Sequence, residues 1–411
     1  MESQIQLVKD YYLANFNRLI EHAQAWYNDI LHPSELGWVS AYRSLDKASQ
    51  CLLVRLYSRK GSLFRSDKLI YNEIPSIPLA LEQLAAKGFI SLSPAISEQQ
   101  LAQTLLTKTE LTPLFHKRFL GQPRSLKKPQ MVELLTDKTF ERFDELNFVV
   151  IELHFAEMID LLLALFFANT HQDLTQFVLD DLGLNQFENY QLSIERRFFN
   201  HRDEVEQLLA LSKLADSYWN ADRKQLEALK QIADAIPAVI EHVYIERKRQ
   251  HLINDIARDF ERLGEFETAL NLFKQTSLPP SRERQARIYD KLEQNDEFSD
   301  IVTLILNQPS DMSELEIAQK LEQRLLRKQG VKIPRVAKPT YKEHHLALDL
   351  SQQRVELAVK HHFETQGWQV FYTENALLNG VMGLTLWDAI FAPVEGVFNQ
   401  RLSIQTTRFI P

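Results

Sequence analysis

The sequence is poor in the features that would place it outside the cell or in a membrane. A single cysteine, Cys51, excludes a disulfide framework and any cysteine-based zinc finger. The first residues lack the basic start and apolar core of a secretory signal. The apolar run over 159–168 is far shorter than the ~20 residues that span a bilayer. We therefore expect a cytoplasmic protein with no membrane partner, associated with the nucleoid if it is bacterial.

Glycine is also scarce, at 11 of 411 residues, whereas leucine, glutamate, glutamine, lysine and alanine are frequent. This composition predicts a mainly α-helical protein. The chain is too long for one ordinary core, so several domains are expected. Its net charge of −8 disfavours uniform coating of nucleic acid, but it leaves room for local basic tracts.

The first basic tract lies in 42–74. A helix through Cys51 and Tyr57 should end near Gly61, and 78–90 should form a helix that ends at Gly88 and enters a strand. This order is typical of a winged-helix-like module. Phosphate binding and a solvated basic face are both open for its cations. The candidate DNA-binding residues here are Arg55, Arg59, Lys60, Arg65 and Lys68.

The second basic tract, Leu111 to Val132, contains no aspartate or glutamate. After a helix capped by Ser97, a loop should lead into a short helix whose N-terminal amides could receive a phosphate. Two basic stretches with few or no acids are unexpected in an acidic chain. DNA binding is therefore favoured over a solvated basic face for this second tract. Its candidates are Lys117, Arg118, Arg124, Lys127 and Lys128.

A third cluster consists of Arg196, Arg197 and Arg202, around the start of a helix predicted near Asn200, after an earlier helix that ends at Gly183. Nearby acids could pair with these arginines, and this structural interpretation is slightly favoured.

The segment from Phe148 to Ala168 is predicted to be one buried helix. His154 and Glu157 lie one turn apart on it, which is a metal-ligand spacing. No third ligand is in view, so a core or edge pair is favoured.

From 216 to 330 the chain is helical and polar, with a weak internal repeat. The apolar positions of one repeat recur 32 residues later, close to a tetratricopeptide period. Helix pairs of this kind bury their apolar faces by stacking. The matching positions are Phe266, Ala269, Leu270 and Phe273, then Phe298, Ile301, Val302 and Ile305.

Near the C-terminal end, a β-like run from Trp368 to Tyr372 leads to one carboxylate, Glu374. An apolar segment, Ala376 to Phe391, follows it. Taken alone, Glu374 is either a metal ligand or a helix-start acid without chemistry.

Four segments, in order, resemble the Fanconi-associated nucleases. They are CLLVRLYSRKGSLFRSDKLIYNEI, VLDDLGLNQFENYQLSIERRFFNHRDEVEQLL, ERLGEFETALNLF and GLTLWDAIF. The resemblance implies a mainly α, multi-domain chain. Its expected parts are a winged-helix-like DNA-binding region (1–96), an SAP-like module (97–147), a helical connector with a basic turn (148–215), tetratricopeptide-like repeats (216–330), and a linker with the start of an α/β nuclease domain of the virus-type replication-repair kind (331–411).

The resemblance also implies an activity. It is phosphodiester hydrolysis with Mg²⁺ or Mn²⁺ near 5′ ends and flaps of branched DNA, in the repair of interstrand crosslinks. The lack of a Cys/His finger resembles the bacterial form. Glu374 matches the first metal-binding glutamate of the family, although Thr373-Glu374-Asn375 replaces the family's Gly-Glu-Gly.

The Pro-Asp and Glu-Val-Lys motifs of the family are not found after Glu374. No complete catalytic set is therefore assigned. Holding two metal ions takes several carboxylates, so we expect these 411 residues to be impaired as a nuclease. In the GLTLWDAIF segment, Leu384 and Trp387 are expected in the core, and Asp388 is expected to be structural.

Three functions stay open from the sequence: a structure-specific nuclease, a non-catalytic scaffold that binds branched or 5′-flap duplex DNA, and a helical-repeat adaptor for proteins. Homodimer formation is also left open.

Overall fold

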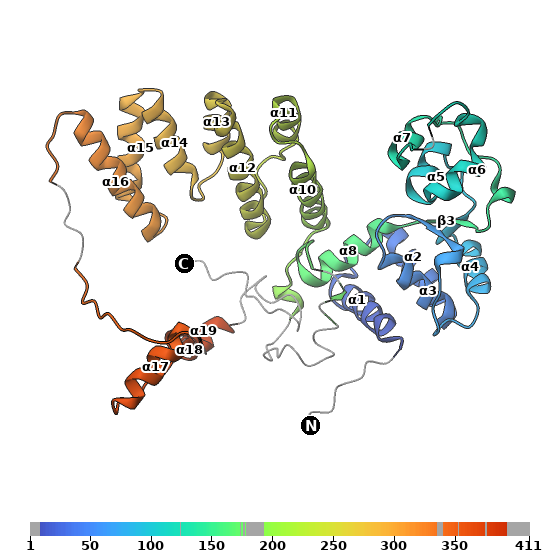
Figure 1. The fold of residues 1–411 in the computed structure, drawn as a ribbon, viewed down its shortest axis with the longest axis horizontal. Helices are drawn as coiled ribbons and strands as arrows, with labels where there is room; N and C mark the ends of the chain where they lie inside the picture. The colour runs from blue at the N-terminus through green and yellow to red at the C-terminus, as the bar shows by residue number, and fades with distance from the viewer. Residues whose placement is uncertain are drawn as a thin grey trace. The chain divides into compact units, whose positions relative to one another are not determined.

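The computed structural model describes residues 9–123, 125–172, 174–175, 177, 193–334, 340–351, 353–374 and 376–392. The chain divides into two compact units between Ser212 and Lys213. The expectation of a mainly helical, multi-domain chain is confirmed (Figure 1). None of the helices in the described ranges combines the length and apolarity that crossing a membrane requires.

The first unit begins with a helical region that carries two short strands. Asp46 and Ser76 cap its third and fourth helices through their side chains, and Gly88, with φ +78°, turns the chain into the following strand. A residue with positive φ is best supplied by glycine, so the predicted helix end at Gly88 is explained locally. The elements are α1 (Tyr11–Tyr27), α2 (Pro33–Arg43), α3 (Lys47–Tyr57), β1 (Leu63–Arg65), α4 (Ile77–Ala86) and β2 (Ile90–Leu92).

The single helix predicted over 148–168 is wrong. The segment forms strand β3 (Val150–Leu153) and then helix α8 (Ala156–Phe167). β3 is the central strand of a three-stranded antiparallel sheet of order β1-β3-β2, and Ile151 faces Phe64 on one side and Leu92 on the other. A short buried apolar strand has the same hydrophobic pattern as a buried helix, so periodicity could not separate them.

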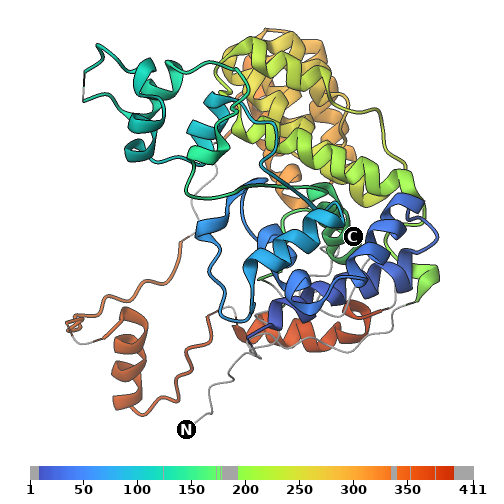
Figure 2. The same cartoon turned by 90° about the vertical axis from the view of Figure 1, so that its right-hand side faces the viewer.

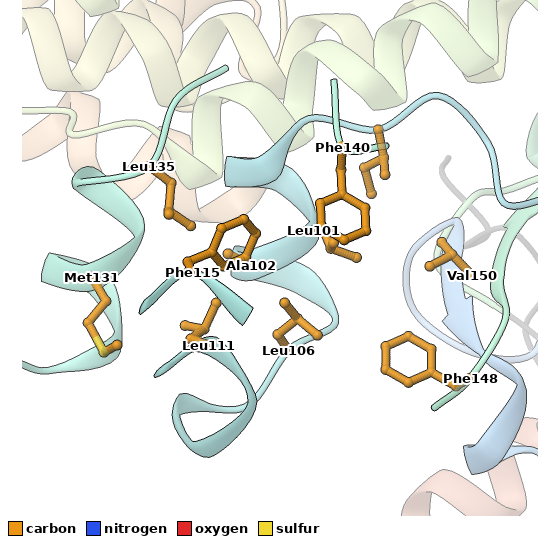
Figure 3. Packing of buried hydrophobic residues seen from close by; sticks show 11 residues of the cluster. Leu101, Ala102, Leu106, Leu111, Phe115, Met131, Leu135, Phe140, Phe148 and Val150 are labelled. Atoms are coloured by element: carbon orange, nitrogen blue, oxygen red, sulfur yellow. The ribbon is translucent and has the colours of Figure 1, made fainter. Parts of the chain in front are cut away.

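Between β2 and β3 the chain forms a small helical module. Leu101, Leu111, Phe115, Met131 and Phe140 meet in its core (Figure 3). Phe148 and Val150, at the start of β3, belong to the same cluster, so the module is packed onto the sheet. Ser97 caps the first helix as predicted. The elements are α5 (Glu98–Thr104), α6 (Lys108–Leu114), the 3-10 turn η2 (His116–Arg118) and α7 (Lys128–Glu133).

Helix α10 (Arg202–Asn220) follows the third basic cluster. Its first turn is capped by Glu204, whose carboxylate accepts hydrogen bonds from the amides of Asn200 and His201 at 2.6 and 3.0 Å. The predicted helix start near Asn200 is therefore confirmed. The predicted helix end at Gly183 lies outside the described residues.

The second unit contains a stack of helices in which each contacts the next (Figure 1 and Figure 2). Of the repeated apolar positions, Phe266 and Ile301 are partly buried and the others are buried. The repeat therefore marks the faces by which neighbouring helices pack. The helices are α11 (Leu226–Asp234), α12 (Val243–Leu263), α13 (Phe266–Phe273), α14 (Ser281–Lys291), α15 (Asn295–Asn307) and α16 (Met312–Lys328).

The C-terminal helices α17 (Val355–Thr365), α18 (Ala376–Thr385) and α19 (Trp387–Ile390) differ from the sequence expectation. Leu384 is 75% exposed and Trp387 is 42% exposed, so their assignment to a core is wrong for the described residues. The predicted strand over 368–372 is also wrong. That stretch pairs with no described strand, and a strand depends on a hydrogen-bonded neighbour.

One buried histidine makes the first unit sensitive to acid. The ring of His22 lies 4.8 Å from the ring of Phe166, and its Nε2 has no hydrogen-bond partner. Burial lowers the pKa of His22 to about 4. The folded state therefore binds fewer protons than the unfolded state, and stability present above about pH 6.5 is lost as the pH falls toward 4.

We expect His22→Phe to remove much of this acid-dependent loss, which is on the order of 2–3 kcal/mol. Urea unfolding at pH 7 and pH 4.5, followed by circular dichroism, measures it. His116→Phe, at an exposed position, is the control. An equal loss on acidification in His22→Phe and in the unaltered chain would show that another group is responsible.

Candidate nucleic-acid interface

The thirteen predicted DNA-binding cations fall into two sets that differ in their partners. In the first tract, Arg55 forms an ion pair with Glu73 at 2.7 Å, and its guanidinium lies 3.8 Å from the centroid of the Tyr12 ring. Arg59 and Lys60 are exposed. Lys68 has 64% of its side chain exposed and lies 3.8 Å from Asp67. The tract therefore offers Arg59, Lys60 and Lys68 to solvent, whereas Arg55 is held by an acid.

Arg65 is the most completely bound of these arginines. It donates to both oxygens of Asp67 at 2.9 Å and to both oxygens of Glu110 at 2.9 and 2.8 Å. It also donates to the carbonyl of Leu105 and stacks on the ring of Phe148. Its hydrogen bonds hold the pKa of Glu110 down, at about 2. Arg65 thus connects β1 with α6, and it has no donor left for a phosphate.

Two arginines of the third cluster are bound in the same way. Arg197 donates to both oxygens of Asp29 at 2.6 Å, and Arg202 donates to both oxygens of Glu35 at 2.8 and 2.7 Å. The expected pairing with a nearby acid is found for Arg202, whose Nε donates to Glu206 at 3.0 Å. Asp29 and Glu35, by contrast, are 168 and 167 residues away from their arginines. They attach the start of α10 to the N-terminal helices. Arg196, by contrast, is exposed.

The second tract is more open. Lys117 and Lys127 are exposed, and Arg118 lies 3.6 Å from Glu98 with 42% of its side chain exposed. Lys128 donates to the carbonyl of Gln103 at 2.9 Å. Arg124 lies outside the described residues. The predicted short helix is α7, which Lys127 precedes.

These contacts define the candidate interface as the exposed cations of the first unit. Within the described ranges, the structure gives no ion pair between a carboxylate and Arg59, Lys60, Lys117, Lys127 or Arg196. Such side chains can approach phosphates without first breaking a bond to an acid. We use the name exposed cation set for Arg59, Lys60, Lys68, Lys117, Arg118, Lys127 and Arg196.

His154 is a structural residue. One ring nitrogen lies 3.0 Å from the hydroxyl of Ser91, and the other lies 3.0 Å from the carbonyl of Gly88. These bonds tie the end of β3 to β2 and to the turn that precedes it. The core or edge interpretation therefore fits this histidine better than metal binding.

Glu374, the predicted metal ligand, lies just before α18. Its side chain is exposed, its φ is +42°, and its carboxylate accepts a hydrogen bond of 2.8 Å from the Tyr372 hydroxyl. This bond raises the pKa of Tyr372. No group of three metal-ligating side chains occurs in the part of the chain that the structure describes. Among the described residues, the donor set around Glu374 therefore lacks the several carboxylates that a two-metal site needs.

Two features were not predicted from the sequence. They are the acids that pair with the arginines and the exposure of one apolar side chain. Glu73, Glu110, Asp29 and Glu35 are distant in sequence from their partners, so no local pattern could identify them. Ile70 is 80% exposed in the first tract. An isoleucine two positions after Lys68 and directly before Tyr71, late in the first tract, was the available signal.

Comparison with known proteins agrees with this arrangement. Residues 10–91 match the family model for the FAN1 HTH domain. The chain is 32% identical over 401 residues to the Fanconi-associated nuclease 1 homolog of Pseudomonas aeruginosa, covering 94% of this chain and 70% of that protein. It is 23% identical over 468 residues to the Arabidopsis thaliana homolog, covering 97% of this chain and 52% of that protein.

A solved structure gives the same result. The crystal structure of paFAN1 bound to 2-nucleotide 5′-flap DNA with a gap superposes with a TM-score of 0.80 at 30% identity, covering 96% of this chain and 73% of that one. The fold is thus that of a modular helical nuclease with an N-terminal helix-turn-helix region. The chain belongs to the Fanconi-associated nuclease 1 family.

Arg65 should be essential for stability. We expect Arg65→Ala to destabilise the first unit by about 3 kcal/mol, because two carboxylates and a carbonyl lose their donor. Urea unfolding of the full chain measures the change. Lys68→Ala, which removes a mostly exposed cation from the same loop, should change stability by less than about 0.5 kcal/mol. Equal effects of the two substitutions would contradict the structural role of Arg65.

Proposed function

We propose that this chain recognises branched duplex DNA that carries a 5′ flap, as a member of a structure-specific nuclease family. The observation that carries the proposal is the superposition, over 96% of this chain, on paFAN1 bound to 5′-flap DNA. A second structure of paFAN1, with a 1-nucleotide 5′ flap and a gap, superposes with a TM-score of 0.78 at 31% identity. Crosslink repair is the process that the family resemblance implies.

The charge distribution supports DNA binding by the first unit. The whole chain has a net charge of −8, so attraction to DNA must come from local groups. The exposed cation set supplies such groups, and most of its members lie in the helix-turn-helix region and the module between β2 and β3. Lysine and arginine contacts to phosphates give affinity that falls as salt rises, because bound counterions are released.

The chemistry of cleavage is a separate question. The family resemblance implies hydrolysis that depends on Mg²⁺ or Mn²⁺, and the surroundings of Glu374 among the described residues do not support it. We therefore propose that residues 1–411 bind flap DNA but do not cleave it efficiently. The function that these residues support is that of a non-catalytic DNA-binding scaffold.

DNA binding is tested by reversing two exposed charges. We expect the double variant Arg59→Glu with Lys127→Glu to weaken binding to 5′-flap DNA at least tenfold and to reduce the slope of log affinity against log salt. Fluorescence anisotropy at several salt concentrations gives both quantities.

The matched control is Lys230→Glu with Lys320→Glu, which makes the same change of charge at exposed positions of α11 and α16. This control should keep most of the affinity. If the two double variants lose affinity equally, the effect is one of net charge, and the candidate interface is wrong. If both keep the original affinity, the exposed cation set does not bind DNA.

Cleavage is tested with the same flap DNA and Mn²⁺. We expect no more product from the unaltered chain than from Glu374→Ala, because no described carboxylates join Glu374 to complete a metal site. Denaturing gel electrophoresis of end-labelled strands measures the product. Efficient cleavage that Glu374→Ala abolishes would overturn this part of the proposal.

A further inference from the structure

The loop between β1 and α4 displays an apolar side chain on a firmly held backbone. Leu69 and Ile74 are each 5% exposed and anchor the loop in the core, while Ile70 between them is 80% exposed. The hydroxyl of Ser66 accepts a hydrogen bond of 2.9 Å from the amide of Val149, which fixes the start of the loop against the chain that enters β3. Ile70 is therefore presented to solvent by a loop attached on both sides.

The two acids of this loop are both paired with arginines. Both oxygens of Asp67 accept from Arg65. Oε1 of Glu73 accepts from Arg55 at 2.7 Å and from the Tyr12 hydroxyl at 2.8 Å. Neither carboxylate is left to repel a phosphate that approaches from outside.

The cations Arg59 and Lys68, near and in this loop, are exposed to solvent. Arg59 lies over the Phe64 ring, 5.6 Å from its centroid, and its guanidinium lies 3.4 Å from the Tyr71 hydroxyl. Tyr71 directly follows Ile70 in the chain, so Arg59 contacts the residue next to the exposed isoleucine. Lys68, two residues before Ile70, has 64% of its side chain exposed. The loop that carries the exposed isoleucine thus has one exposed cation within it and a second in contact with it.

We propose that Ile70 acts as a wedge that inserts into the base stack at the branch point of a flapped duplex, while Arg59 and Lys68 contact the phosphates on either side. This inference rests on the proposed function and adds a residue that distinguishes branched DNA from continuous duplex. Proteins that kink DNA commonly insert an apolar side chain between base steps from a basic surface. Such insertion costs least where stacking is already interrupted, as it is at a flap or a nick.

The surroundings favour DNA over a protein partner at this loop. Lysine is depleted at the centre of protein interfaces, and Lys68 is exposed in the same loop as Ile70. A lone isoleucine is also a much smaller apolar surface than the contiguous patches that mark protein interfaces.

The experiment uses the full chain and two DNAs of equal length, one continuous and one with a 5′ flap, each with 2-aminopurine at the base beside the branch position. We expect Ile70→Ala to lower affinity for the flap DNA about tenfold and to leave affinity for the continuous duplex unchanged. The 2-aminopurine fluorescence that rises when the unaltered chain unstacks the branch base should be lost. Ile70→Leu should restore both signals.

The control is Val239→Ala, which removes a 75% exposed apolar side chain from the other unit and should change neither signal. The salt slope should be the same for Ile70→Ala and for the unaltered chain, because no charge is removed. Equal loss on flap and continuous DNA, or an unchanged fluorescence rise in Ile70→Ala, would overturn the wedge while leaving DNA recognition intact. Failure of the unaltered chain to bind either DNA would instead overturn the proposed function.

Discussion

The pairing of β3 between β1 and β2 is the constraint on which the first unit depends. The chain leaves the sheet at the end of β2, builds the module of α5 to α7, and returns to the central position of the same sheet. The two ends of the module are therefore held by backbone hydrogen bonds rather than by a linker. Because Phe148 and Val150 also enter the core of the module, its cations and those of the helix-turn-helix region belong to one packed framework.

Arginine and lysine have different tasks in this framework. Arg65, Arg197 and Arg202 each make two-pronged contacts with carboxylates that lie far away in sequence, and each has a mostly buried side chain. The planar guanidinium suits this task because it can satisfy a whole carboxylate and stack on a ring at once. The lysines of the same tracts are compact, strongly hydrated charges, and most of them stay in water. The fold thus divides each basic tract into cations that bind carboxylates within the protein and cations that remain exposed.

The parts of the fold that the sequence predicts well are those decided locally. Helix starts at Ser97 and Asn200 follow from capping side chains within a few residues, and the turn at Gly88 follows from its positive φ. The parts that it misses depend on distant partners. β3 is a strand because β1 and β2 pair with it. Arg197 is not available to bind DNA because Asp29 already accepts its hydrogen bonds. Composition and period carry no information about either partner.

The same reasoning decides what Glu374 and Ile70 contribute. A metal ligand works only when the fold brings further carboxylates to it and holds them, and α18 beside Glu374 has no buried residue to fix its position. Recognition of a branch point has fewer structural requirements. It needs one apolar side chain on an anchored loop, exposed cations in or next to that loop, and acids that are already paired. The loop of Ile70 meets that condition through Leu69, Ile74, Arg55 and Arg65, all of which belong to the first unit. Selection among DNA structures can therefore reside in the helix-turn-helix region, independently of the residues that hydrolyse the strand.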